Sequence, residues 1–239
     1  MTSFHKKRSL VAIWFMPRRV FKALAEEERR IWGFPLLIIG LALLIRTLAS
    51  GWVKQMEMVI PALPPEFQYY LPEEQERLMR ALELTKGPLF VYIFPAFGSL
   101  LGMFMQWFVL SGVMRTSLRM LRDKTSGVII RNITAWGSLP FTLRYFIQAV
   151  YIFLAGRQIT QTGLAGLAEP GDPLMLSFWG SLDIYLIWQV FLILLGCKYT
   201  ARIPLWKSIP SLLVSIFIVL VLSAIVSMGM DTLGGMLSA

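Results

Sequence analysis

The sequence predicts an all-α, polytopic membrane protein, and two patterns in the chain support this fold class. Five apolar stretches are each about long enough to cross a ~30 Å hydrocarbon layer as a helix, and the basic residues are concentrated in alternate segments between them. Inside a bilayer an unpaired backbone group is very costly, so such stretches must be helices. The chain is 56% hydrophobic and 15% charged, which agrees with this class. The expected spans are residues 32–53, 88–114, 132–155, 174–197 and 208–230.

The distribution of Lys and Arg predicts which end of the chain lies on which side. Segments 1–31, 115–131 and 198–207 together hold 16 of the 23 basic residues. The opposite side holds five, together with eight carboxylates in the loops 54–87 and 156–173. Because basic loops stay on the cytoplasmic side, we expect five spans with the N-terminus in the cytoplasm and the C-terminus outside.

The N-terminal segment 1–31 predicts a basic, amphipathic element ahead of a membrane domain that covers residues 32–239. Pro17 suits the first turn of a helix, in which Val20, Phe21 and Leu24 fall on one face. Such a helix can lie along lipid headgroups. It is either a docking or lipid-sensing surface, or an anchor that holds the first span in place. The basic residues available for headgroup or partner contact are Arg18, Arg19 and Lys22.

Two loops carry further expectations. In the external loop 54–87, Pro72 is expected to open a helix with two carboxylates in its first turn, where the helix dipole favours them. The cytoplasmic loop 115–131 is short and strongly basic. It is either a solvated loop that fixes topology or a contact for lipid phosphates or an acidic partner. Its candidate contact residues are Arg115, Arg119 and Arg122.

Three ionisable residues fall within the expected spans: Arg46, Arg144 and Asp183. Each costs on the order of 2.5–3.5 kcal/mol at a helix centre unless it is paired or hydrated. Counting about 1.5 Å per residue places all three at similar depth, which predicts an ion pair, with Asp183 and Arg144 as the first choice. The cluster either lines a polar cavity for a substrate, ion or lipid headgroup, or acts as a lock that fixes how the spans pack.

Small residues predict places where helices approach closely in lipid. Gly98 and Gly102 form one such pair in the second span, and Ser223 and Ser227 form another in the fifth. Internal packing is the first interpretation and a homodimer face is the second. The prolines expected to kink their spans are Pro95 and Pro140.

The residues that most catalytic or cofactor sites require are missing from the spans. The only histidine is His5, and no glycine-rich nucleotide-binding loop is present. Asp183 is the only carboxylate in a span, and the only cysteine, Cys197, fits a packing role. We therefore expect no enzymatic activity, no metal and no cofactor. The net charge of +9 lies beside membrane spans, so anionic lipid headgroups rather than nucleic acid are the expected partners.

The order of several short motifs resembles bacterial members of the Yip (Ypt-interacting protein) family. The run from Leu182 through Asp183 to Trp188, followed by Gly196 and Lys207, is similar to the family's fourth-span pattern. Two further motifs resemble the starts of the family's third span and of its N-terminal region. They are Trp136-Gly137-Ser138-Leu139-Pro140, and Pro17 and Phe21 followed by Trp32-Gly33-Phe34-Pro35.

The resemblance implies a five-span fold and a non-enzymatic role. Some bacterial members are similar in role to accessory subunits that work beside ABC-type exporters. We therefore expect a multi-pass protein of the bacterial cytoplasmic membrane that acts as a non-catalytic adaptor or accessory subunit, with such an exporter as a partner. The alternatives are a small transporter or lipid- or peptide-binding protein that uses Arg46, Arg144 and Asp183, and a membrane-shaping homo-oligomer.

Overall fold

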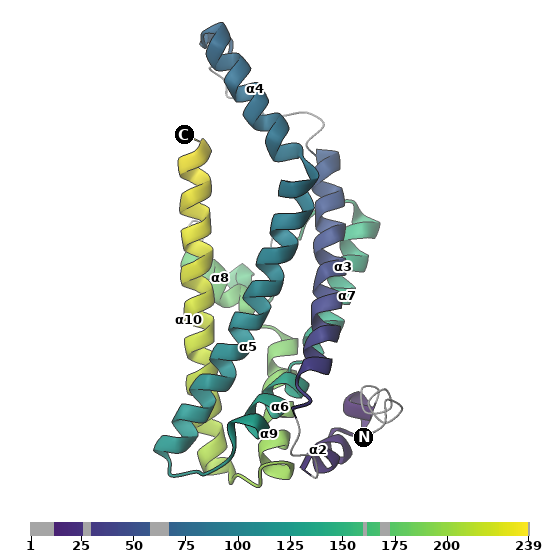
Figure 1. The fold of residues 1–239 in the computed structure, drawn as a ribbon, viewed down its shortest axis with the longest axis vertical. Coiled ribbons are helices and arrows are strands. Elements are labelled where there is room, and N and C mark those ends of the chain that lie inside the picture. The colour runs from purple at the N-terminus through teal and green to yellow at the C-terminus, as the bar shows by residue number, and fades with distance from the viewer. Residues whose placement is uncertain (1–11, 26–29, 58–66, 160–161, 168–172, 239) are drawn as a thin grey trace.

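The structure is a computed structural model that describes residues 12–25, 30–57, 67–159, 162–167 and 173–238. Throughout these ranges the regular elements are helices and no strand occurs, as the sequence predicts. The long helices run roughly parallel in an elongated bundle (Figure 1). The longest are α3 (Gly33–Glu57), α5 (Phe94–Met120) and α10 (Leu205–Ser238), and the shorter α6 (Gly127–Gly137), α7 (Pro140–Ala155) and α9 (Ile184–Tyr199) pack with them.

Four stretches of the described chain are long and apolar enough to cross a membrane. Their bounds are Gly33–Met56, Leu89–Met120, Gly127–Ala155 and Leu205–Val226. They correspond to the first, second, third and fifth expected spans. The protein is therefore a membrane protein with several spanning helices.

The fourth expected span, 174–197, is wrong as a single helix. The structure divides this stretch into α8 (Pro173–Ser181) and α9, and Figure 1 shows α8 turned across the bundle. The 16 residues of α9 reach only ~24 Å at about 1.5 Å per residue, short of a ~30 Å core. Five crossings therefore stay a prediction, as does the side taken by each chain end. The helix α2 (Pro17–Ala25) and the end of α10 lie at opposite ends of the bundle (Figure 1).

The division between α8 and α9 has a local cause. Asp183 adopts an extended backbone conformation, with φ −139° and ψ 176°, and its side-chain oxygen accepts a hydrogen bond from the backbone N–H of Leu186. This is the geometry of a helix N-cap, for which Asp is among the preferred residues. The chain therefore starts a new helix at a position where the apolar run alone predicts one continuous helix. A carbonyl group in the last turn of α8 has a hydrogen-bond donor in the segment beside it, because Leu164 N–H donates to the carbonyl oxygen of Trp179 at 3.0 Å.

Both expected kinks coincide with irregular backbone. The third span breaks between α6 and α7, and Pro140 occupies the first turn of α7. Pro95 lies at the start of α5, directly after a short π-helical segment, Leu89–Ile93 (η2). Proline has no N–H to donate and its ring crowds the preceding turn, so a helix must restart or widen there.

Two helices lie at the ends of the bundle. The helix α4 (Pro72–Lys86) begins at the expected proline and projects beyond the spans (Figure 1). At the other end, α2 buries Val20, Phe21 and Leu24, but its apolar face packs on α9 and neighbouring helices rather than on lipid. A hydrogen bond of 2.7 Å from Thr200 Oγ1 to the carbonyl oxygen of Phe21 fastens the two helices together.

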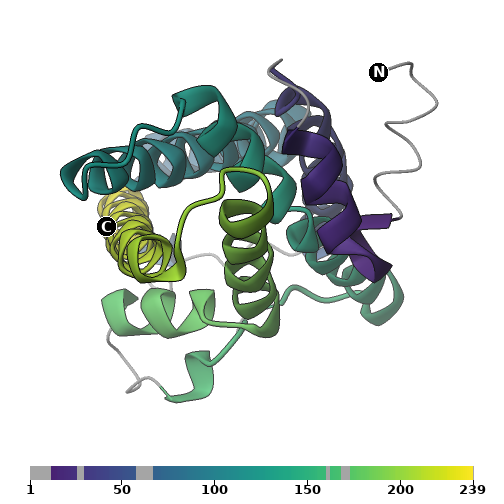
Figure 2. The ribbon, with the colours of Figure 1, turned by 90° about the horizontal axis from the view of Figure 1, so that it is seen from below.

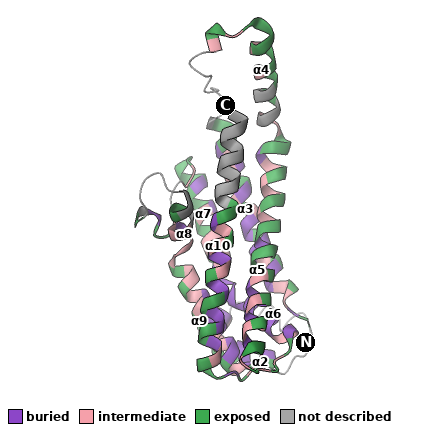
Figure 3. Cartoon of the chain, turned by 90° about the vertical axis from the view of Figure 1, so that its left-hand side faces the viewer, coloured by how far each residue is buried: buried purple, intermediate pink, exposed green. Residues whose placement is uncertain are grey.

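Seen along the bundle axis, α9 lies among α2, α6, α7 and α10 (Figure 2). Buried residues gather around it where α2 and α6 meet it (Figure 3). Two glycines permit this close packing. A Cβ on Gly137 would come within 2.5 Å of Ile193 Cγ1, and a Cβ on Gly196 within 2.5 Å of Ile133 Cγ2. A larger residue at either position would clash with the facing helix, so the close packing of α9 depends on both glycines.

Candidate functional site

The structure brings Arg144 and Asp183 together at the centre of the bundle. Arg144 lies in the second turn of α7 and Asp183 is the N-cap of α9, and the distance from Arg144 Nε to Asp183 Oδ2 is 3.0 Å. The two side chains are 16% and 11% exposed. A charge-assisted contact of this length between nearly buried groups removes much of the cost of placing either charge in the membrane.

The carboxylate of Asp183 makes a second interaction. While Oδ2 pairs with Arg144, Oδ1 accepts the hydrogen bond from Leu186 N–H at 2.9 Å. A negative charge is favoured at a helix N-terminus, where unpaired N–H groups and the helix dipole point outward. One residue therefore begins α9 and joins it to α7, and this explains why an acidic residue occurs here within apolar sequence.

Arg46 belongs to the same region, and no described carboxylate forms an ion pair with it. It lies on α3, and its charge acts on both Tyr145 and Arg144. Its Nε is buried and has no hydrogen-bond partner among the described residues. The cluster thus contains two guanidinium groups and one carboxylate, and that carboxylate is already shared between Arg144 and the start of α9.

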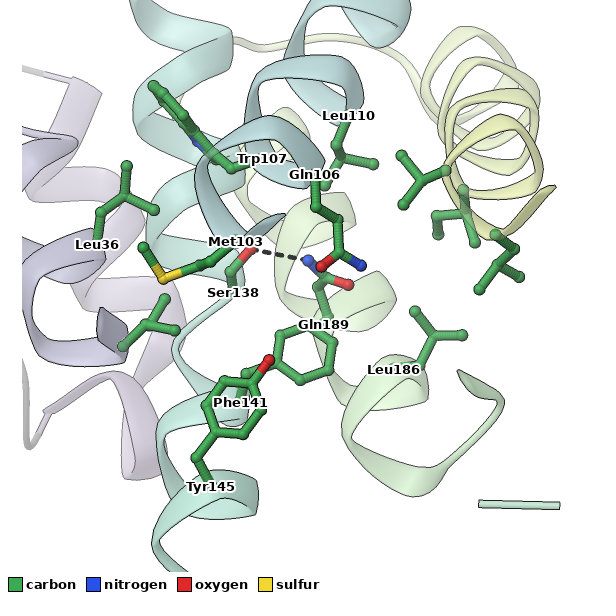
Figure 4. A pocket seen from close by; sticks show the side chains of 14 residues that line it. Leu36, Met103, Gln106, Trp107, Leu110, Ser138, Phe141, Tyr145, Leu186 and Gln189 are labelled. Carbon is green, nitrogen blue, oxygen red and sulfur yellow. Dashed lines mark hydrogen bonds between the residues drawn. The ribbon is translucent and has the colours of Figure 1, made fainter. Parts of the chain in front are cut away.

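A small cavity adjoins the cluster, lined by residues of α3, α5, α7, α9 and α10 (Figure 4). Within it Gln189 Nε2 donates to Ser138 Oγ at 2.8 Å, and Gln106 and Gln189 point toward one another. Tyr145 lines the cavity and lies near Arg46, Arg144 and Asp183. Sequence reasoning missed Tyr145, and its only signal was its position next to Arg144.

The size of the cavity decides what it can hold. Its volume is about 40 Å³, which exceeds the ~10–15 Å³ that one water needs and is far below the ~300 Å³ at which small-molecule pockets begin. In this conformation the centre of the bundle accommodates water, and a substrate of ordinary size does not fit.

The expected helix-packing residues are not the ones that pack within this chain. Gly98 and Gly102 are exposed, and a Cβ added to either would meet nothing within 4 Å. Their internal packing role is therefore wrong for this chain. Ser223 is half-buried, and the side chain of Ser227 lies outside the described residues. Close approach occurs instead at Gly137 and Gly196, and Gly196 was named only as part of a family motif.

The basic residues lie near the end of the bundle that carries α2. Five of the six expected contact residues are exposed: Arg18, Arg19, Lys22, Arg119 and Arg122. Arg115 is half-buried, with its guanidinium against Gly127 at the start of α6. In the α5–α6 loop, Asp123 Oδ2 lies 3.9 Å from Lys207 Nζ at the start of α10. The exposed basic residues make this end of the bundle positively charged.

Within the described part of the chain, no three His, Cys, Asp or Glu side chains gather as a metal site would require. A family model for the Yip1 domain matches residues 11–228. No curated protein and no solved structure matches the chain.

Proposed function

Because the chain belongs to the Yip1 domain family of membrane proteins, we propose that it is a non-catalytic membrane subunit that binds another membrane protein. An ABC-type exporter is the first candidate partner, and the cytoplasmic membrane of a bacterium is the proposed location. The proposal extends the family's membrane character to a specific role. It rests on the outward face of α5 and on the small size of the central cavity.

The face of α5 is the observation that carries the proposal. In the most apolar part of the stretch Leu89–Met120, 11% of residues are buried, against 28% or more in the other three spanning stretches. Gly98 and Gly102 lie open on this helix beside the exposed side chains of Leu101 and Met105. In lipid, small residues favour helix association because they let two backbones approach closely. A helix that uses few of its residues inside its own chain is suited to bind a helix of another protein.

The polar centre supports a structural rather than a transporting role. Asp183 has partners for both carboxylate oxygens, and the cavity of about 40 Å³ holds water rather than a substrate. A fixed bundle with one open helix face is the form expected of an accessory subunit.

Copurification in mild detergent tests the proposal. The tagged protein should elute in a complex that mass spectrometry identifies as an exporter. Gly102→Leu should abolish that complex without lowering the protein's own melting temperature, because a Cβ at this position meets nothing within 4 Å. Gly33→Leu is the matched control, since it also meets nothing but lies on α3. A wild-type protein that always elutes alone, or an intact complex with Gly102→Leu, would overturn the proposal. A complex with itself that tubulates liposomes would favour the membrane-shaping alternative.

Arg46 favours a second candidate function. Its buried Nε has no hydrogen-bond partner in the part of the chain that the structure describes, and a buried arginine attracts an anion. A conformation with a wider cavity would therefore bind an anionic lipid or peptide there. This transporter or binding role predicts that Arg46→Met removes binding of an anionic peptide to the purified protein while the melting temperature is maintained. Unchanged binding with Arg46→Met would refute it.

A further inference from the structure

Two arginines reach across the contact between α5 and α6, near the end of the bundle that carries α2 (Figure 1). A Cβ on Gly127 would lie 2.7 Å from the guanidinium Cζ of Arg115, so the side chain of Arg115 on α5 lies against the start of α6. The guanidinium Cζ of Arg131 on α6 lies 5.9 Å from the ring centroid of Phe108 on α5. These four residues form the α5–α6 seam, to which each helix contributes one arginine.

Helical spacing places both arginines on the same side of the seam. Phe108 and Arg115 lie seven positions apart on α5, and residues at that spacing share a helix face. Gly127 and Arg131 lie four positions apart on α6 and share a face in the same way. Because Phe108 is 55% exposed, this side of the seam faces out of the bundle. Arg119, four positions after Arg115, is exposed on the same face and adds a third positive charge.

The charges of the seam are not balanced within the described part of the chain. No described carboxylate forms an ion pair with Arg115, Arg119 or Arg131. Asp123, the only carboxylate in the α5–α6 loop, accepts hydrogen bonds from Thr125 and lies beside Lys207 of α10 instead.

The guanidinium of Arg115 also has an unused donor, because its Nε is buried without a hydrogen-bond partner among the described residues. All the N–H groups of a guanidinium are donors and none accepts. An anion rich in oxygen atoms would give the two arginines the acceptors that the described chain does not supply.

The depth of the seam favours a lipid over a soluble anion. Arg115 lies five residues before the end of the spanning stretch Leu89–Met120, and Arg131 lies four residues after the start of Gly127–Ala155. At about 1.5 Å per residue, both backbones are ~6–8 Å inside the ends of these stretches. Arginine side chains at such positions extend their charge to the headgroup level while the stem stays in apolar surroundings.

An exposed aromatic strip continues from the seam along α5. Its members are Phe97, Phe104 and Phe108, all exposed, and their spacing of seven and four positions places them on the face that carries Arg115. Gly102 lies on another face of the helix, so a protein partner bound there leaves this strip open to lipid. The strip is apolar throughout and leads toward the middle of the spanning stretch, as an acyl chain below a phosphate does.

We propose that the α5–α6 seam binds an anionic phospholipid, with its phosphate between Arg115 and Arg131 and an acyl chain along the aromatic strip. Basic sites between spanning helices recognise anionic headgroups, and the planar guanidinium group matches two phosphate oxygens at once. An acidic segment of a soluble partner suits the seam less well, because both arginines lie inside the ends of the spanning stretches rather than beyond them.

Native mass spectrometry of the purified full chain with added phosphatidylglycerol or phosphatidylcholine tests the site. Since a basic residue near a headgroup strengthens binding about fivefold, two should favour phosphatidylglycerol roughly 25-fold. Arg115→Gln with Arg131→Gln should remove this preference and leave weak binding of both lipids. The matched control is Arg18→Gln with Arg19→Gln, which removes the same number of charges from α2 and should keep the preference. Equal binding of the two lipids by the wild type, or the same loss in the control, overturns the proposal.

Melting temperatures separate a lost site from a folding defect and a lipid from a free anion. A ligand that binds only the folded protein raises its melting temperature, and each variant is compared with its own lipid-free value. Phosphatidylglycerol should stabilise the wild type and the control but not the Arg115/Arg131 variant. Inorganic phosphate at the same concentration should stabilise none of them. Equal stabilisation of the wild type by phosphate, or of the seam variant by phosphatidylglycerol, overturns the lipid site.

Cross-linking tests the path of the acyl chain. The wild-type protein is irradiated with phosphatidylglycerol that carries a photoreactive group on its acyl chain, and the adducts are located by mass spectrometry. Adducts should concentrate on residues 97–108 of α5. Adducts spread equally over all the spanning helices would show an ordinary lipid shell and overturn the site.

Discussion

Asp183→Asn is the sharpest single test of what the central ion pair does. Asparagine keeps the shape of the side chain, and its oxygen can still accept the hydrogen bond from Leu186 N–H that begins α9. The change therefore removes the negative charge beside Arg144 and leaves the helix start in place. Any loss of stability then reports on the contact of 3.0 Å between Arg144 and Asp183.

The size of the expected loss follows from burial. Arg144 is 16% exposed, so the variant leaves a nearly buried guanidinium without its carboxylate. Breaking a buried pair on one side costs about 3–5 kcal/mol. We expect the lower end of this range, since both side chains have some contact with solvent. For a chain of this size, about 3 kcal/mol lowers the melting temperature by roughly 6–12 °C.

Replacing both partners separates a lock from a functional site. Arg144→Met with Asp183→Leu should be more stable than either single variant, because no charge is then left buried alone. The coupling free energy should be at least ~2 kcal/mol. The remaining deficit, about 1 kcal/mol, reflects the lost N-cap of α9. Apparent melting temperatures in detergent, followed by fluorescence-detected size-exclusion chromatography, measure all four proteins.

Asp123→Asn serves as the control, because its pair with Lys207 is longer, at 3.9 Å. The two pairs are similarly buried, so the longer distance is what differs, and we expect Asp123→Asn to lose less stability than Asp183→Asn. If Asp183→Asn melts like the wild type, the lock is refuted. If transport or ligand binding is also lost at normal stability, the transporter alternative takes its place.

Two further predictions concern packing. Gly196→Ala should destabilise the protein by about 1–3 kcal/mol, because the added Cβ would lie 2.5 Å from Ile133 Cγ2. Gly102→Ala should be neutral or gain about 0.5–1 kcal/mol of stability from helix propensity. Equal melting temperatures of the two variants would contradict this prediction. Thr200→Val should cost about 1–3 kcal/mol, because it leaves the buried carbonyl of Phe21 without its side-chain donor. Faster tryptic cleavage within α2 would confirm the loosening, and unchanged cleavage would contradict it.

The apolar stretches and the short motifs were sufficient for the fold class and the family. Four of the five expected spans appear with boundaries close to those expected, because burial in lipid requires long runs of apolar residues whatever the neighbouring helices do. The start of α4 at Pro72 was also predictable, since proline and first-turn carboxylates act locally.

The fourth span shows where periodicity and length fail. The apolar run alone predicts that Asp183 is an ionisable residue inside a continuous helix. Asp is also among the residues preferred at a helix N-cap, and that is its position in the structure. Gly180-Ser181 just before it is a local signal that could have indicated the break. The pairing of Asp183 with Arg144, which lies 39 positions earlier in the chain and supplies the opposite charge, is set by which helices meet.

By itself the sequence determined that the protein is helical, lies in a membrane and belongs to its family, because hydropathy, proline and basic residues act along the chain. The tertiary structure alone decided which glycines pack and which face outward. Gly102 and Gly196 both lie in apolar helices, and they differ in whether a neighbouring helix lies against them. It also decided that Arg144, rather than Arg46, pairs with Asp183. Such pairings depend on which helices meet, and that is a property of the whole bundle.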